Sequence, residues 1–196
     1  MVIGYVEAWA FSKDGCGKRK LDAIRVDSLT HLFASFGYIN PGTYEIYPMP
    51  DVDIKDLKAI TDLKQKAPGI RVWLALGGWT FSDDGTDTQP VFGDLSSTPS
   101  KRKKFIDQLE KFMLQWGFDG VDFDWEYPGA KDRGGHSDDG VNYVALVDDV
   151  RRRFENSRRG WGISFTAPSS YWYLRHFQIE KMMKYVDFVN LMTYDL

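Results

Sequence analysis

Short apolar segments alternate along the whole chain with segments in which apolar residues recur at helical spacing. The apolar segments, each of which predicts a buried strand, are 2–8, 31–39, 70–76, 121–125, 161–167 and 186–194. Strands that are apolar almost throughout are typical of parallel sheets, because helices cover both faces of such a sheet. The alternation therefore predicts an α/β fold, which is either a doubly wound sheet or a TIM (β/α)8 barrel.

The helical segments have recognisable ends. The longest begins at Thr98-Pro99, an N-cap residue followed by a first-turn proline, and Gly117 stands where a C-cap glycine is expected. Helices are expected at 53–66, 98–116, 143–154 and 179–186. Since no repeat, linker or low-complexity tract divides the chain, these elements are expected to form one domain.

The loop after the first strand excludes a dinucleotide-binding fingerprint. Gly15-Cys16-Gly17 supplies only the first half of G-x-G-x-x-G, and Lys20 stands in place of the third glycine. In both candidate architectures, functional side chains lie at the carboxyl ends of the strands. We therefore look for a site at those ends.

Composition argues against several function classes. Lys and Arg number 25 against 28 Asp and Glu, a net charge of −3, whereas a nucleic-acid-binding protein normally carries a basic excess. The densest basic runs, 101–104 and 151–153, are interpreted as solvated helix faces. A single cysteine, Cys16, excludes an internal disulfide and any zinc site built from several cysteines.

Neither a membrane span nor a signal peptide is predicted. No stretch approaches the roughly 18 apolar residues that a bilayer-spanning helix needs. Residues 1–11 are apolar, but they include Glu7 and lack a basic beginning. The sequence also indicates no obligate protein partner.

Three carboxyl groups stand at alternate positions of the fourth predicted strand. In the run 118–129, FDGVDFDWEYPG, the side chains of Asp122, Asp124 and Glu126 project from one face, because side chains two apart in a strand point the same way. Buried charges must be paired, hydrogen-bonded or neutralised. Crowding of like charges raises one pKa strongly, so we expect the three groups to share a proton. This pattern favours acid–base catalysis.

Two other interpretations of the carboxyl row are weaker. A surface edge strand would not place Val121, Phe123 and Trp125 on its opposite face, where they need covering. A Ca²⁺ or Mg²⁺ site usually gathers oxygen ligands from a loop or from several elements, and no EF-hand spacing is present. We therefore predict no metal site here.

The same residues resemble a known family. The run Asp119-x-x-Asp122-x-Asp124-x-Glu126, followed by Tyr127-Pro128-Gly129, is similar to the signature of glycoside hydrolase family 18, the chitinase family. Further matching segments follow in the family's order: Gly4-Tyr5, Ala34-Ser35-Phe36, Gly77-Gly78-Trp79 and Met192-Thr193-Tyr194-Asp195. The sequence around these motifs looks most like that of the fungal class V, killer-toxin-like chitinases. The resemblance implies a TIM barrel.

The resemblance also implies a mechanism, which is retaining and substrate-assisted. Glu126 would protonate the glycosidic oxygen and later activate water, while the substrate's own acetamido oxygen attacks the anomeric carbon. Asp124 would hydrogen-bond the acetamido N–H, with Asp122 holding Asp124. Tyr194 would orient the acetamido carbonyl. No metal or organic cofactor is implied.

Substrate-binding positions carry over from the same motifs. Trp79 and Tyr127 would line the subsites next to the cleaved bond, and Tyr5 and Phe36 would shape the bottom of the pocket. The full set expected to bind substrate is Tyr5, Phe36, Gly77, Gly78, Trp79, Thr80, Tyr127, Met192, Thr193 and Asp195. Phe36 and Met192 also fit a place in the core. Trp172 and Tyr173 fit either an extension of the groove or core packing.

The expected function is hydrolysis of β-1,4-linked N-acetylglucosamine polymers, with chitin or chito-oligosaccharides as substrate and, by resemblance, a secreted location. One alternative is a chitinase-like lectin, which typically lacks the acid that Glu126 supplies here. Another is an endo-β-N-acetylglucosaminidase acting on N-glycans. The chain departs from the family's frequent serine at Ala75, where a hydroxyl near the aspartates is lost.

Chain length adds one expectation. A (β/α)8 barrel typically takes about 250 residues, and six strands are predicted in these 196 residues. By resemblance, residues 1–196 are expected to form an incomplete catalytic domain that lacks strands seven and eight and the usual small inserted domain.

Overall fold

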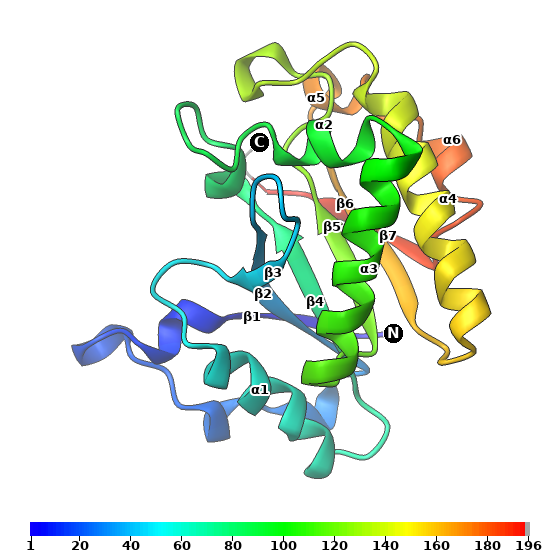
Figure 1. Ribbon diagram of the computed structural model, residues 1–196. Coiled ribbons are helices and arrows are strands. Elements are labelled where there is room, and N and C mark those ends of the chain that lie inside the picture. Colours follow the sequence, from blue (N-terminus) through cyan, green and yellow to red (C-terminus); the bar gives the residue numbers. More distant parts are fainter. Residues whose placement is uncertain (195–196) are drawn as a thin grey trace.

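The computed structural model describes residues 1–194 as one sheet with helices packed against it (Figure 1). Six strands are parallel and follow the order β1 (Ile3–Glu7), β2 (His31–Ile39), β4 (Arg71–Gly77), β5 (Gly120–Asp124), β6 (Gly162–Pro168) and β7 (Phe188–Met192). The short strand β3 (Ile46–Pro48) pairs antiparallel with β2. The prediction of six parallel strands is confirmed.

Helices separate the strands. The α-helices are α1 (Ile54–Asp62), α2 (Val91–Ser96), α3 (Pro99–Trp116), α4 (Asp139–Ser157), α5 (Tyr171–Leu174) and α6 (Ile179–Met182). Short 3₁₀ turns are η1 (Ala8–Phe11), η2 (Gly15–Gly17), η3 (Leu21–Ala23), η4 (Val26–Ser28), η5 (Leu63–Gln65), η6 (Trp79–Ser82) and η7 (Lys131–Arg133). Across residues 1–194, no helix has the length and apolar character that a bilayer crossing requires.

Local signals account for the ends of α3. The Thr98 side chain accepts a hydrogen bond from the Lys101 N–H, which satisfies one donor left open in the first turn. Gly117 ends the helix with φ 79°, a left-handed conformation that favours glycine. The predicted boundaries of this helix are therefore confirmed.

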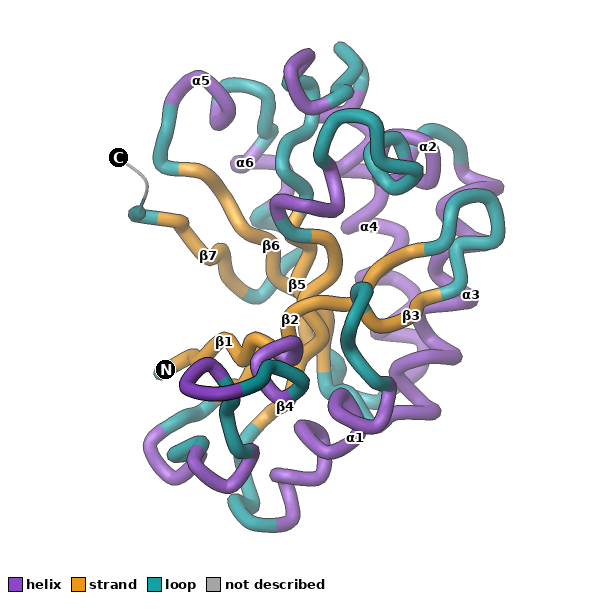
Figure 2. The backbone as a smooth tube through the Cα atoms, turned by 90° about the vertical axis from the view of Figure 1, so that its left-hand side faces the viewer, coloured by secondary structure: helices purple, strands orange, loops and turns teal. Residues whose placement is uncertain are grey.

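The sheet curls into part of a barrel (Figure 2). Its two edge strands, β1 and β7, are far apart in the strand order. Nevertheless, the Phe188 ring on β7 stacks on Trp73 of β4 at 5.1 Å and lies 6.3 Å from Phe33 of β2. Such contacts between non-adjacent strands require curvature, so the fold is a partial TIM barrel, as predicted.

Two glycines make room for the large ring inside the barrel. A Cβ on Gly120 would lie 2.4 Å from the Trp73 indole, and one on Gly162 would lie 2.0 Å from it. Both distances are shorter than real carbon contacts allow. The floor of the barrel is therefore an aromatic layer formed by Trp73, Phe33 and Phe188.

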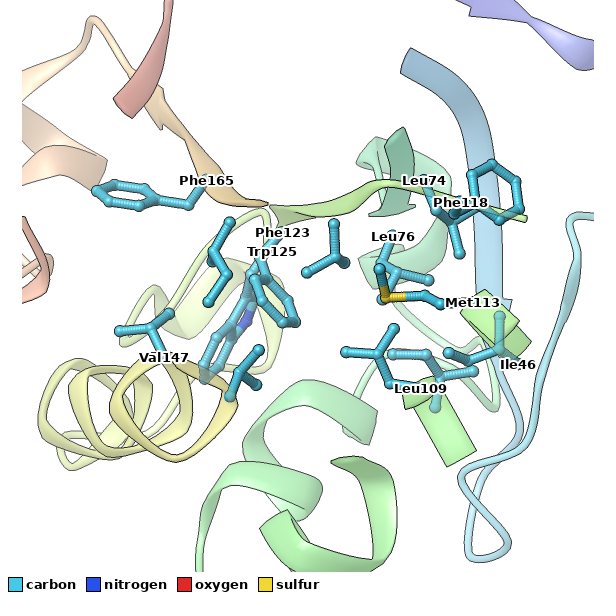
Figure 3. Close-up of a cluster of buried hydrophobic side chains, with 14 of the residues drawn as sticks. Ile46, Leu74, Leu76, Leu109, Met113, Phe118, Phe123, Trp125, Val147 and Phe165 are labelled. Carbon is cyan, nitrogen blue, oxygen red and sulfur yellow. The ribbon is translucent and has the colours of Figure 1, made fainter. Parts of the chain in front are cut away.

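The opposite face of the sheet packs on the helices. Figure 3 shows Leu74 and Leu76 of β4 on the same side as Leu109 and Met113 of α3. Phe123 of β5 packs on Phe105 of α3, with ring centroids 6.2 Å apart. All of these side chains are buried, and burying a side chain of this size contributes roughly 1.5–3 kcal/mol. The apolar residues that alternate with the carboxyl row therefore anchor β5 against the helical layer.

Candidate active site

A cavity of about 560 Å³ opens at the carboxyl ends of β2, β4, β5, β6 and β7. Its lining residues are Phe36, Trp79, Asp124, Glu126, Tyr127, Pro168, Ser169, Ser170, Tyr173, Met192 and Tyr194. Parallel strands present their carboxyl ends at one edge of a barrel, which explains why residues from distant segments meet here. This is the end of the sheet at which the sequence predicts a site.

Asp122 is fully buried. It does not line the cavity, whereas Asp124, two residues later, does. The Asp122 Oδ2 accepts a hydrogen bond from the Tyr5 hydroxyl at 2.7 Å. Its Oδ1 accepts one from the Ser164 hydroxyl at 2.6 Å and one from the Asn190 amide at 3.1 Å. Three donors from β1, β6 and β7 therefore hold this carboxyl group in one orientation.

Asp124 and Glu126 follow on the same side, and both are buried. The Thr166 hydroxyl of β6 donates a hydrogen bond to Asp124 Oδ1. Glu126 lies two residues beyond the end of β5 and lines the cavity. The three carboxyl groups thus form a row that leads from the barrel interior to the cavity.

Burial and mutual repulsion change the acidity of this row. Burial raises the pKa of Asp122 to about 6, although the hydrogen bonds from Ser164, Tyr5 and Asn190 oppose the shift. The pKa of Asp124 is raised well above its usual range by burial and by the charges of Glu126 and Asp122. Burial and the charges of the neighbouring carboxylates therefore both favour the protonated form of Asp124.

Aromatic side chains form one wall of the cavity. Trp79 is 50% exposed, and its ring meets Tyr127 edge-on with centroids 6.5 Å apart. Tyr127 in turn stacks on Tyr173 at 4.2 Å. The pKa of the Tyr127 hydroxyl is raised by burial, by the charge of Glu126 and by a hydrogen bond to the Glu126 side chain. Tyr173 therefore belongs to the cavity, whereas Trp172 is exposed and does not line it.

The remaining predicted residues lie at different distances from the cavity. Phe36 and Met192 line it while packing against the core, and Tyr194 lines it with 64% of its surface exposed. The Tyr5 hydroxyl contacts Asp122, and Tyr5 does not line the cavity. Thr193 is exposed next to Met192. Asp195 lies outside the described residues.

Gly77, Gly78 and Thr80 shape the backbone beside the row. A Cβ on Gly77 would lie 2.3 Å from the Asp124 carbonyl oxygen, so only glycine permits this approach. The Gly78 N–H donates to the same carbonyl oxygen at 2.9 Å. Thr80 shares a hydrogen bond of 2.8 Å with the Tyr38 hydroxyl. These residues position the loop that carries Trp79.

Ala75 lies directly beside Asp122 in the sheet, with Ser35 on its other side. The buried Ser35 hydroxyl has no hydrogen-bond partner within residues 1–194. Asp122 nevertheless accepts three hydrogen bonds from other strands. The hydroxyl missing at position 75 therefore does not leave this carboxyl group unsupported.

Sequence reasoning missed Ser164, Thr166 and Asn190, which all donate to the carboxyl row. A signal for them exists, because polar residues at alternate positions in apolar strands mark an inward-facing polar stripe. The stripe alone does not identify the partner of each residue. No cluster of three or more His, Cys, Asp or Glu suited to a metal ion occurs in the part of the chain that the structure describes.

Comparison with known proteins shows which family the chain matches. The family model of the glycosyl hydrolases family 18 matches residues 1–196. The chain is 30% identical to an endochitinase of Manduca sexta over all of its own length and 35% of that protein. It is 35% identical to the killer toxin subunits alpha/beta of Kluyveromyces lactis, over 62% of the chain and 11% of that protein.

A solved structure agrees with this match. The Group IV chitinase of Ostrinia furnacalis in complex with allosamidin has a TM-score of 0.86 and 29% identity to this chain. The match covers 99% of the chain and 50% of that structure. The chain therefore spans about half or less of the length of the relatives it matches.

Proposed function

Because the chain belongs to the glycosyl hydrolases family 18, we propose that it carries the acid–base machinery of a chitinase, which hydrolyses β-1,4-linked N-acetylglucosamine polymers. The observation that supports this proposal most directly is the row Asp122, Asp124 and Glu126, which leads into a cavity with an aromatic wall. An extracellular location, which the resemblance implies, is part of the same proposal.

The first step breaks the glycosidic bond. Glu126 transfers its proton to the glycosidic oxygen as the bond from that oxygen to the anomeric carbon breaks. The carbonyl oxygen of the substrate's 2-acetamido group bonds to the anomeric carbon from the opposite face and forms an oxazolinium ion. No protein carboxylate attacks the sugar, which is the known departure of this family from other retaining enzymes.

The second step releases the sugar. Water attacks the anomeric carbon from the face that the leaving group vacated, and its proton passes to Glu126. The acetamido ring opens, and the two inversions together retain the configuration. One residue therefore serves as acid and then as base, which matches its place at the cavity end of the row.

The other two carboxyl groups stabilise the developing charge. Asp124 hydrogen-bonds the acetamido N–H and, when ionised, offsets the positive charge of the oxazolinium ring. Asp122 shares a proton with Asp124 in this proposal, since burial raises the pKa of both groups. Tyr194, on the β7 side of the cavity, orients the acetamido carbonyl in this proposal.

The aromatic wall supports a carbohydrate substrate. The apolar C–H faces of sugar rings pack on aromatic faces, and Trp79, Tyr127 and Tyr173 line one cavity. Amphipathic rings of this kind bury large areas while keeping a polar group available. We infer that these residues hold N-acetylglucosamine units next to the cleaved bond.

The decisive experiment compares two substrates. The purified protein is incubated with chito-oligosaccharides and, separately, with a high-mannose glycopeptide, and products are separated by chromatography. Cleavage of the oligosaccharides alone supports the proposal, whereas cleavage of the glycopeptide alone supports an endo-β-N-acetylglucosaminidase. Binding of chito-oligosaccharides without any product supports a lectin and contradicts the proposal.

A further inference from the structure

Arg133 is a buried cation that joins two loops at the edge of the cavity. It lies in η7 and is 7% exposed. Its Nε donates to the Glu126 carbonyl oxygen at 3.0 Å, and its Nη1 donates to Asp83 Oδ1 at 2.9 Å. Its Nη2 donates to the Trp79 carbonyl oxygen. One side chain therefore contacts the main chain of the proposed acid and of the exposed aromatic residue.

The guanidinium group also contacts the Trp79 ring. The Arg133 Cζ lies 3.8 Å from the centroid of the indole, which places the cation over the ring. A cation in this position attracts the π-system and restrains the ring. Half of the Trp79 surface remains exposed, and the residue lines the cavity. Arg133 therefore restrains the ring while leaving surface available for a ligand.

The sheet does not hold either residue directly. Strand β4 ends at Gly77 and β5 ends at Asp124, so Trp79 and Glu126 both lie two residues beyond a strand end. Residues past a strand end lack the ladder of backbone hydrogen bonds that holds the strand itself. The contacts of Arg133 supply a cross-link between the two loops at this level.

Arg133 is itself held in place by its own loop. The Asp139 Oδ2 accepts hydrogen bonds from the N–H groups of Gly129 at 3.0 Å and His136 at 2.7 Å. The Gly135 N–H donates to the Ala130 carbonyl oxygen at 2.8 Å and closes the turn. These hydrogen bonds fix the backbone of the loop that carries Arg133.

From this geometry we propose that Arg133 is a positioning residue, which fixes the Glu126 main chain and the Trp79 indole relative to each other. The proposal rests on the function proposed above, because it concerns the same cavity. Arginine suits the task, since its planar fork carries several donors in fixed directions and stacks on aromatic rings. Lysine offers one compact charged group and cannot reproduce both kinds of contact.

Arg102 provides a matched control for a purely structural role. It is also buried, at 9% exposure, and it also pairs an aspartate with a carbonyl oxygen. Its Nε donates to Asp149 Oδ2 at 2.6 Å, and its Nη1 donates to the Ser96 carbonyl oxygen at 2.9 Å. Arg102 lies on α3 and does not line the cavity.

The first experiment measures hydrolysis of chito-oligosaccharides by Arg133→Met, Arg133→Lys and Arg102→Met. We expect both Arg133 variants to lose at least about 10-fold in kcat/KM, because a displacement of about 1 Å at a catalytic group costs as much as 10²-fold. Arg102→Met is expected to lower thermal stability while retaining kcat and KM. Wild-type kcat/KM in Arg133→Met, or an equal loss in Arg102→Met, would overturn the proposal.

The second experiment needs no turnover. Protein labelled with 5-fluorotryptophan is studied by ¹⁹F NMR, and the Trp79 signal is assigned with Trp79→Phe. Arg133→Met is expected to move and broaden that signal, and Arg102→Met to leave it in place. An unmoved signal in Arg133→Met contradicts the inference.

The two proposals fail in different ways. A wild-type protein that cleaves no chito-oligosaccharide contradicts the proposed function, while the ¹⁹F signal still reports whether Arg133 restrains Trp79. An active wild-type protein whose Arg133 variants behave normally in both measurements contradicts the positioning role alone.

Discussion

The Tyr5 hydroxyl donates a hydrogen bond of 2.7 Å to Asp122 Oδ2 and so joins β1 to β5, two strands that are not neighbours in the sheet. The pKa of Tyr5 is strongly raised by burial and by the charge of Asp122, so the hydroxyl stays protonated and remains a donor. Tyr5, which is expected to shape the bottom of the pocket, therefore contacts the innermost carboxyl group.

Tyr5→Phe tests this contact. Loss of a hydrogen bond that stabilises ionised Asp122 should raise the pKa of Asp122, by roughly one unit if the bond contributes about 1.5 kcal/mol. We expect kcat/KM to fall by about 10-fold and the acid limb of its pH profile to move to higher pH. Tyr44→Phe is the control, since the Tyr44 hydroxyl also donates to an aspartate, Asp94, away from the cavity. An unchanged acid limb in Tyr5→Phe would refute the link.

Asp122→Asn tests the cost of the buried charge. The pKa of Asp122 is about 6 in the folded protein against 3.8 for an unperturbed aspartate, so the folded state binds the proton more tightly. The free energy of unfolding should therefore fall as pH rises from about 4 to 6. Above that range the ionised Asp122 should lower it by about 3 kcal/mol. Asparagine carries no such charge.

We therefore expect Asp122→Asn to gain stability relative to wild type between pH 4 and pH 7.5, although its hydrolysis rate falls. Urea unfolding at the two pH values measures the difference. If the stability difference between variant and wild type is the same at both values, Asp122 does not titrate in this range.

Glu126→Gln tests the proton donor. The amide keeps the shape of the side chain but cannot protonate the glycosidic oxygen, so we expect a loss of at least about 10²-fold in rate. Oligosaccharide binding, measured by titration calorimetry, should stay close to that of wild type. A variant that keeps more than about a tenth of the wild-type rate would show that another group is the acid.

Product stereochemistry tests the nucleophile. Attack by the acetamido oxygen predicts that the first product is the β-anomer, which ¹H NMR detects before mutarotation. A thiazoline analogue of the oxazolinium ion should inhibit competitively, and Asp124→Ala should be severely impaired although Asp124 forms no bond to carbon. An α-anomeric first product would indicate direct attack by water.

Much of the fold follows from local sequence. Six apolar segments separated by amphipathic ones predict six parallel strands, and each appears within a few residues of its predicted range. Strand β3 and helices α2 and α5 were missed. Each is too short for a periodic pattern, and β3 exists because residues after the turn at 40–42 pair back onto β2.

The row of carboxyl groups is also specified locally. Alternation puts Asp122 and Asp124 on one side of β5, because the period of a strand is two, and Glu126 follows two residues beyond the end of the strand. The apolar residues between them face the helices for the same reason. Sequence alone therefore predicts the groups that the proposed chemistry uses.

The partners of those groups depend on distant parts of the chain. Asp122 receives hydrogen bonds from residues 117, 42 and 68 positions away, namely Tyr5, Ser164 and Asn190. Arg133 reaches the Trp79 carbonyl oxygen 54 positions away. No local pattern encodes these pairings, because they arise when the sheet curls and brings the ends of separate strands together. Folding of the whole chain thus sets the acidity of the carboxyl row and the placement of the aromatic wall, while the sequence specifies which residues stand in each strand.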